Sequence, residues 1–369
     1  MCPLASPSVV FGAIDEEERR GTRSAWVGQS EQPVSGGEGS GHRVVPEGLE
    51  PLAIVGTTAS GKSAGAMELA RRRGDVELVS VDSMQVYRGM DIGTAKPTTA
   101  EQAEVRHHVI DLVEPWETFE VHSFQAAVRE ALYDIAARGR RAVLVGGTGL
   151  YLRAVTDGFE IPGRFPEVAA QLDAAVDAAP VAEDAIVTLH RRLQELDPLA
   201  ASRMEPNNRR RVVRALEVTL GSGRPFSSFG PGLDAHPPSP VNMVGLWLPR
   251  PVVAARIDAR YHRQLDDGFL DEVRALRRLP HPLSRTAAQA LGYRELLAHL
   301  RAVGRGEPHP TLTEALDEAI RRTRRFARRQ RVWFRRDPRI TWIGAAEDPS
   351  VAVPALVAEA EQRWGPSTA

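Results

Sequence analysis

Cysteine and lysine are nearly missing from this sequence of 369 residues. The single cysteine, Cys2, excludes a disulfide framework and any metal site built on several thiolates, and this composition fits a reducing compartment. Two of the 47 basic residues are lysines, Lys62 and Lys96, and all the others are arginines. A chain that prefers arginine so strongly and still keeps Lys62 indicates that a compact ammonium group is needed there.

Long apolar stretches and an excess of charge are also absent. No apolar run reaches the roughly 18–20 residues that span a bilayer, and the N-terminus lacks the features of a secretory signal. We therefore expect a cytoplasmic protein with no membrane partner. The formal net charge of −1 says nothing about partners, and the hydrophobic fraction of 42% is ordinary for a globular chain.

Composition divides the chain into five predicted segments, where length alone suggests about two to two and a half domains. Residues 1–50 hold eight glycines and six serines without apolar periodicity, which predicts a disordered extension. Residues 51–159 predict the first part of an α/β core, and residues 160–205 a helical insertion. Residues 206–345 would complete the core and carry an arginine-rich helical region, followed by a C-terminal helix and tail at 346–369.

Within the core, strands and helices alternate. Short apolar strands are expected at 51–56, 77–82, 108–113 and 141–145, with a possible fifth at 241–248. Helices are expected at 62–73 and at 121–137, where Phe124, Val128, Leu132 and Ile135 form one stripe. Because helices separate successive strands, the predicted fold class is α/β, with a parallel sheet and helices on both faces.

The most specific motif is a glycine-rich loop that directly follows the first strand. It fits the pattern G-x-x-x-x-G-K-[ST] with Gly56, Thr57, Thr58, Ala59, Ser60, Gly61, Lys62 and Ser63. Glycines let backbone N–H groups converge on phosphate oxygens, and the N-terminus of the next helix adds positive potential. Lys62 would reach the outer phosphate, and the Ser63 hydroxyl would be a ligand for Mg²⁺. The loop predicts a phosphate or diphosphate site without saying which ester binds. It also makes the predicted parallel sheet P-loop NTPase-like, with a helical insertion and a helical C-terminal region.

Taken alone, this loop is also typical of ATP-binding enzymes such as a nucleotide hydrolase or a small-molecule kinase. Asp82 ends the second predicted strand, where such an enzyme holds Mg²⁺ or activates a substrate hydroxyl. Spacing along the sequence does not separate these roles.

Several further segments narrow the choice, and with the phosphate loop they closely resemble the tRNA dimethylallyltransferases, also called tRNA isopentenyltransferases. The resemblance runs in order from about Leu52 to Trp342. Its segments are SVDSMQVYRGMDIGTAKP at 80–97, GGTGLY at 146–151, RVVRALEV at 211–218, QALGYR at 289–294 and the stretch 324–334.

This resemblance implies transfer of a dimethylallyl group from dimethylallyl diphosphate to N6 of the adenine just 3′ of the anticodon. The loop would hold the diphosphate, and Mg²⁺ would neutralise the charge that develops on it. Asp82 would be the general base that removes the N6 proton, and Arg260 would face the diphosphate. Lys62, Asp82 and Arg260 are thus the expected catalytic residues of a monomer that binds the donor and a tRNA anticodon stem-loop.

The same resemblance implies that the insertion at 160–205 and the arginine-rich region within 206–345 contact tRNA. It also implies which single residues make contact. They are Asp82, Ser83, Met84, Gln85, Thr148, Arg210, Arg211, Arg214, Gln289, Tyr293 and Arg294. Residues 321–339 add ten arginines, one acid and several aromatic residues, a composition that suits phosphate contact and base stacking. Two positions depart from the family pattern: Thr57, where the family commonly has proline, and Ala169, where it has a basic residue.

Two other functions stay open at this point. An enzyme that prenylates free adenine nucleotides would share the phosphate loop, but it needs neither the arginine-rich helix nor the insertion. A P-loop small-molecule kinase would leave the distinctive stretch 82–97 without an explanation.

Overall fold

A computed structural model describes residues 43–230 and 232–366 of the chain. Its centre is a parallel sheet in the order β3-β2-β4-β1-β5-β6. The strands are β1 (Leu52–Gly56), β2 (Val76–Val81), β3 (His107–His108), β4 (Arg141–Gly146), β5 (Asn242–Trp247) and β6 (Ile340–Gly344). The predicted α/β class is confirmed, although the third strand is reduced to two residues and a sixth is added at the far edge.

Helices make up most of the remaining described chain. They are α1 (Lys62–Arg73), α2 (Thr99–Glu104), α3 (Val121–Ala137), α4 (Gly149–Thr156), α5 (Pro166–Asp177), α6 (Ala182–Leu196), α7 (Pro198–Ser202), α8 (Arg209–Ser222), η2 (Phe226–Phe229), α9 (Arg250–Asp266), α10 (Phe269–Arg277), η3 (Ala287–Gln289), α11 (Tyr293–Gly304), α12 (Leu312–Arg335), η4 (Pro349–Ala352) and α13 (Val353–Trp364). None of the helices in the described part of the chain has both the length and the apolar character needed to cross a membrane.

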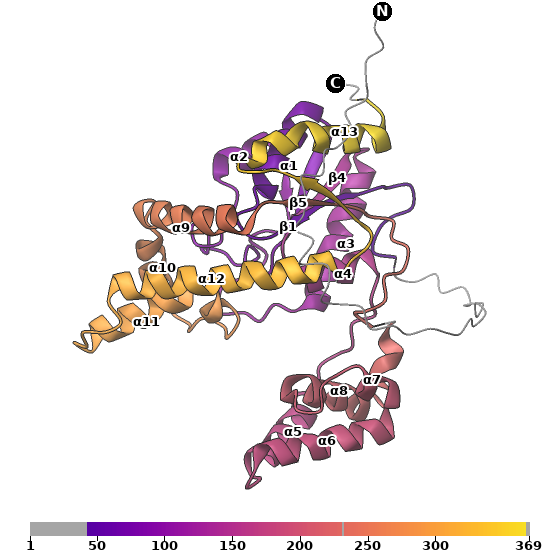
Figure 1. Cartoon of the computed structure of the whole chain (residues 1–369), viewed down its shortest axis with the longest axis vertical. Helices are drawn as coiled ribbons and strands as arrows, with labels where there is room; N and C mark the ends of the chain where they lie inside the picture. Colours follow the sequence, from indigo (N-terminus) through magenta and orange to yellow (C-terminus); the bar gives the residue numbers. More distant parts are fainter. Residues whose placement is uncertain (1–42, 231, 367–369) are drawn as a thin grey trace, which may run out of the picture. The chain divides into compact units, whose positions relative to one another are not determined.

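Both faces of the sheet are covered by helices (Figure 1). Leu52 and Ile54 of β1 face a core shared with α1 and α13, whereas Ala53 and Val55 face a larger core shared with α3, α4 and α12. Burial on both sides explains why the central strands read as continuous apolar runs instead of alternating ones. The predicted stripe of α3 is confirmed, because all four of its side chains are fully buried in the larger core.

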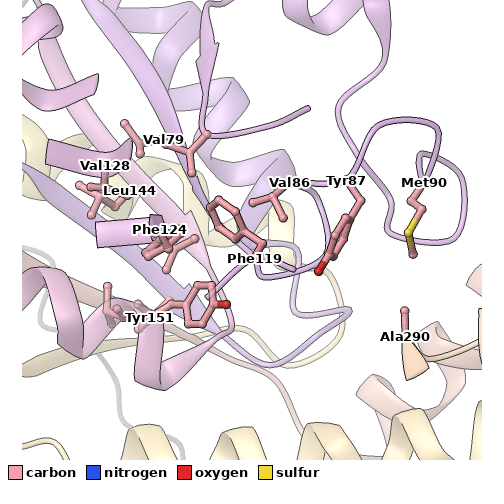
Figure 2. Close-up of a cluster of buried hydrophobic side chains, with 14 of the residues drawn as sticks. Val79, Val86, Tyr87, Met90, Phe119, Phe124, Val128, Leu144, Tyr151 and Ala290 are labelled. Atoms are coloured by element: carbon pink, nitrogen blue, oxygen red, sulfur yellow. The ribbon is translucent and has the colours of Figure 1, made fainter. Parts of the chain in front are cut away.

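The larger core supports the loop that follows β2. Figure 2 shows Val86 and Tyr87 of this loop in one cluster with Phe124 and Val128 of α3 and with Tyr151 of α4. The ring centroids of Phe124 and Tyr151 lie 4.5 Å apart. This packing holds the segment after β2 in place at the carboxyl end of the strand.

The insertion has a small core of its own, built by α5, α6 and α8. Leu172, Leu193, Val212 and Leu216 are buried together there. The predicted boundary at residue 205 lies too early, because it separates α8 from the two helices that α8 packs against.

The described fold also begins earlier than expected. Val44, Val45 and Leu49 are buried in the larger core, and the Trp364 indole of α13 donates a hydrogen bond to the Glu50 carbonyl at 2.8 Å. The prediction of disorder is therefore wrong for residues 43–50. Its remaining part, residues 1–42, lies outside the described residues.

Two truncations that differ by six residues test this boundary. A chain that starts at Leu49 lacks the buried Val44 and Val45, and burial of a valine side chain contributes about 1.5–3 kcal/mol. We expect its unfolding temperature to lie roughly 5–10 °C below that of a chain that starts at Arg43. Equal unfolding temperatures in a calorimeter would show that residues 43–48 do not belong to the fold.

Candidate active site

The loops that follow β1, β2 and β4 meet at one edge of the sheet, because parallel strands all end there. The phosphate loop follows β1, Asp82 follows β2 and Thr148 follows β4. The Thr148 N–H donates to the Val81 carbonyl, and its Oγ1 accepts from the Ser83 N–H, both at 3.4 Å. The structure therefore brings together three of the predicted site segments that are far apart in the sequence.

The phosphate loop is tightly wound. Ala59 and Gly61 both have left-handed backbone, with φ of 61° and 86°. Gly61 lies against the Pro349 ring of η4, where a Cβ would stand 2.4 Å from the ring, so only glycine fits. With Gly61 as its N-cap, α1 begins at Lys62 and directs its first N–H groups toward the loop.

Two cations stand beside this loop. Arg260 of α9 donates from Nη1 to Thr58 Oγ1 at 2.8 Å, and Lys62 donates from Nζ to the Thr57 carbonyl at 3.3 Å. Burial lowers the pKa of Lys62 to about 8, while the Asp82 carboxylate raises it and the Arg260 guanidinium lowers it further. Burial also lowers the pKa of Arg260. Two poorly solvated cations with a single carboxylate nearby favour an anionic ligand.

Unsatisfied polar atoms mark the same place. Ser60 Oγ and Arg260 Nε are buried and have no hydrogen-bond partner among the described residues. A cavity of about 460 Å³ beside them is lined by α9 and by Ala59. Arg256 also lines this cavity and donates from Nε to the Ala59 carbonyl at 2.9 Å. An anion with several acceptor oxygens would supply the missing partners.

Asp82 is held by its own loop. Its Oδ1 accepts a hydrogen bond from the Met84 N–H at 2.9 Å, which orients the carboxylate. The Gln85 carboxamide accepts from Ser80 Oγ at 2.7 Å and donates to the Ala95 carbonyl at 3.1 Å. Asp82 therefore keeps a fixed orientation beside partly exposed neighbours, as a residue that receives a proton from a substrate requires.

Glu272 of α10 anchors a later part of the loop that follows β2. Its carboxylate accepts from the N–H groups of Asp91, Ile92 and Gly93 at 2.7–3.2 Å and from the Tyr293 hydroxyl at 2.6 Å. Tyr293 is fully buried. Its side chain cannot reach an RNA in this structure, so we reassign Tyr293 from tRNA contact to support of the loop.

The remaining basic and polar residues predicted to contact tRNA away from the sheet edge are at least partly exposed. They are Arg210, Arg211, Arg214, Gln289 and Arg294. Arg214 also has a structural role, since it donates to Glu217 at 2.6 Å and to the Pro162 carbonyl at 2.8 Å, where the chain enters the insertion.

The arginine-rich stretch 321–339 does not form one continuous basic surface. Arg324 pairs with Asp258 of α9, Arg339 pairs with Asp157 at 2.6 Å, and Arg331 is buried with its guanidinium 3.8 Å from the centre of the Trp247 ring. The exposed members are Arg321, Arg325, Arg328, Arg329, Arg335 and Arg336. The interpretation of the whole run as an RNA surface is thus too broad, because Arg324 and Arg331 hold α12 against α9 and the sheet, and Arg339 is paired beyond the end of the helix.

Gln330 of α12 lies in the stretch 324–334 that resembles the family, but it is not among the site residues predicted from the sequence. It is 6% exposed, accepts from the Thr58 N–H at 2.8 Å through Oε1 and donates to the Gly147 carbonyl at 2.9 Å through Nε2. A lone amide within a run of arginines is the signal that could have pointed to it.

The described residues hold no group of three or more histidine, cysteine or acidic side chains that could bind a metal ion. Ser63 lies exposed in the first turn of α1. A Mg²⁺ ion here would depend on this hydroxyl, water and the oxygens of a bound phosphate, which is a common arrangement for Mg²⁺.

Comparison with known proteins now identifies the family. Residues 85–337 match the family described as IPP transferase, and residues 50–113 match the isopentenyl transferase family. The chain belongs to the IPP transferase family. The resemblance inferred from the motifs is confirmed, and the chain is an enzyme of this type.

Relatives and solved structures agree with this assignment. The tRNA dimethylallyltransferase of Salinispora arenicola is 47% identical over 301 residues, which cover 82% of this chain and 84% of the relative. The one from Thermobifida fusca is 45% identical over 296 residues, covering 79% and 89%. The tRNA isopentenylpyrophosphate transferase of Bacillus halodurans matches with 36% identity and a TM-score of 0.58, covering 85% of this chain and 96% of that one.

A eukaryotic dimethylallyltransferase acting on tRNA has the same fold. It superposes with a TM-score of 0.67 at 24% identity, covering 85% of this chain and 78% of the other. Together with the parallel sheet and the phosphate loop, these structures confirm the P-loop NTPase-like core.

The lowered pKa of Lys62 predicts how anion binding depends on pH. With its pKa lowered to about 8, Lys62 should lose most of its charge between pH 7 and pH 9. The Kd for dimethylallyl thiolodiphosphate, an unreactive analogue of the expected donor, should therefore rise by up to roughly tenfold between pH 7 and pH 9. In the Lys62→Arg variant, whose cation does not deprotonate, the Kd should be flat over this range. A flat profile for the unmodified enzyme in calorimetric titrations would contradict the role of Lys62.

Proposed function

We propose that this enzyme transfers a dimethylallyl group from dimethylallyl diphosphate to N6 of the adenine just 3′ of a tRNA anticodon. The observation that carries the proposal is the meeting of two poorly solvated cations, Lys62 and Arg260, with a phosphate loop that lies near the Asp82 carboxylate. This arrangement provides an anion site beside a proton acceptor, which alkyl transfer from a diphosphate requires.

The loop and its cations would act on the leaving group. As the bond between the allyl carbon and the diphosphate oxygen breaks, negative charge grows on that oxygen. Arg260, Lys62 and the N–H groups at the start of α1 stabilise this charge, and they need not move because α9 and the loop already hold them. A Mg²⁺ ion bound by the Ser63 hydroxyl and the diphosphate would neutralise further charge.

Asp82 would act on the nucleophile. The lone pair of the adenine amino group is delocalised into the ring, so N6 becomes positively charged as it attacks the allyl carbon. Asp82, oriented by the Met84 N–H, removes a proton and relieves this charge. Ser83, Met84, Gln85 and Thr148 border Asp82 and would contact the target adenine or its neighbours, once that base has left the anticodon stack.

A tRNA acceptor is favoured over the two other candidate functions. The relatives are named as tRNA-modifying enzymes, and neither a free adenine nucleotide nor the substrate of a small kinase needs the insertion or the exposed arginines of α12. We also propose that the enzyme acts as a monomer, which light scattering of the purified protein would test.

The proposed chemistry is tested with dimethylallyl diphosphate, Mg²⁺ and bulk tRNA, followed by mass spectrometry of the nucleosides. The unmodified enzyme should produce N6-(dimethylallyl)adenosine. The Asp82→Asn variant should bind tRNA and the thiolodiphosphate within a few-fold of normal while turnover falls by roughly 10²–10⁴, the usual range for a lost general base. Turnover near the normal rate would exclude Asp82 as the base.

Substitution of exposed arginines of α12 tests whether tRNA is the partner. Replacing Arg325, Arg328 and Arg329 with alanine should weaken tRNA binding and reduce its salt dependence. The logarithmic slope should decrease by up to about 0.7 for each phosphate of single-stranded RNA that an arginine no longer neutralises. The affinity for the thiolodiphosphate should stay unchanged, because the phosphate loop and α9 carry that site.

A matched control replaces three other arginines, Arg71, Arg72 and Arg106, none of them in α12. Arg71 and Arg72 form half-exposed ion pairs with Glu104 and Glu68, which contribute little to stability. This variant loses the same charge and should keep the tRNA salt dependence. Equal loss in both variants would show a general effect of net charge and would contradict an RNA surface on α12.

A further inference from the structure

We propose that Gln330 is a positioning residue that sets the donor site relative to the acceptor site, an inference that rests on the proposed function. Its carboxamide joins the phosphate loop, which would bind the diphosphate, to the loop after β4, which adjoins Asp82. Gln330 itself touches neither the diphosphate nor the adenine in this proposal.

The two contacts of Gln330 span long stretches of sequence. Thr58 is 272 residues away and Gly147 is 183 residues away, yet both hydrogen bonds are short, at 2.8 and 2.9 Å. An amide is the side chain that serves both partners at once, because Thr58 offers an N–H and Gly147 offers a carbonyl. A carboxylate would repel the Gly147 carbonyl, and an apolar side chain would leave both groups unsatisfied in a buried place.

The space around Gln330 is closed. A Cβ on Gly147 would stand 2.4 Å from Gln330 Nε2 and 3.2 Å from the Gly56 carbonyl. Glycine at position 147 is therefore needed so that the amide can lie between the two loops. Close packing therefore fixes the contact of the Gln330 amide with both loops, unlike a contact made by a mobile surface side chain.

The contacts around Thr58 and Gly147 show which parts of the site the Gln330 amide would position. Thr58 is held from two sides, because Gln330 accepts from its N–H and Arg260 donates to its hydroxyl. Arg256 donates to the carbonyl of the next residue, Ala59. On the other side, Thr148 follows Gly147 and bonds to Val81 and Ser83, the residues on either side of Asp82. Loss of the amide would let the leaving group and the base drift apart, and small misplacements of this kind lower turnover strongly.

The test compares Gln330→Met and Gln330→Glu with the unmodified enzyme in the prenylation assay. In Gln330→Met, loss of the link to Thr58 should raise the KM for dimethylallyl diphosphate and the Kd of its thiolodiphosphate analogue roughly tenfold. The carboxylate of Gln330→Glu can still accept from the Thr58 N–H but faces the Gly147 carbonyl, so turnover should fall in both variants while the KM and the Kd change less in Gln330→Glu. The Kd for tRNA should stay within a few-fold of normal.

Gln125→Met is the matched control. It removes a glutamine amide of α3 that donates to two carbonyls, those of Ala154 at 2.6 Å and Phe159 at 3.0 Å, neither of which belongs to the phosphate loop. This variant should lose a similar amount of thermal stability and keep the normal KM and analogue Kd. If Gln330→Met shows only the loss of stability seen in the control, Gln330 is structural and the proposal is wrong.

A double-mutant cycle gives a second, independent readout. Gly147→Ala should raise the analogue Kd by pushing the amide away, and Gln330→Ala should raise it by removing the amide. The effects should be less than additive in the double variant, since the closest contact of the added methyl, that with Gln330, is then gone and the contact with the Gly56 carbonyl at 3.2 Å remains. Additive effects would overturn the proposal. An unmodified enzyme that prenylates no tRNA would instead contradict the proposed function itself, which keeps the two failures apart.

Discussion

The parallel pairing of β1 with β4 and β5, and of β4 with β2, is the constraint on which the other features of the site depend. Parallel neighbours cannot be joined by tight turns, so the chain must return along a face of the sheet between them, usually as a helix. All the strands then end at one edge, and the loops after β1, β2 and β4 gather there. The phosphate loop, Asp82 and Thr148 become neighbours for this reason, although no local feature of the sequence connects them.

The site is arranged around an anion. Lys62 and Arg260 are poorly solvated cations, and Arg260 Nε and Ser60 Oγ have no protein partner among the described residues. In the protein without a bound anion, such groups lower the stability of the fold, since buried charges and unsatisfied polar atoms carry an unfavourable free energy. A diphosphate would remove that cost. The same groups would then stabilise the charge that the leaving group gains in the transition state, so donor binding and catalysis would share one set of contacts.

Helix α12 combines two roles that its composition does not separate. Arg324 and Arg331 hold it against α9 and the sheet, and Gln330 reaches the phosphate loop, whereas Arg325, Arg328 and Arg329 point to solvent. Exposed arginines remain available for an RNA backbone because their neighbours on the inner side anchor the helix. In this arrangement the proposed tRNA surface and the donor site lie on opposite sides of one rigid element.

Features that depend on contiguous residues could be predicted from the sequence: the α/β class, the phosphate loop, the bounds of α1 and α3, and the family. They follow from backbone conformation and from spacing within one helix or loop, which neighbouring residues control. Other features appear only in the folded chain: Tyr293 is buried on Glu272, Val44 and Val45 belong to the core, and α8 completes the insertion. The exposure of particular arginines and the place of Gln330 between two loops far from it in sequence are of the same kind. These outcomes depend on which side chains the packed helices bring into contact, and composition and spacing along the sequence do not determine those contacts.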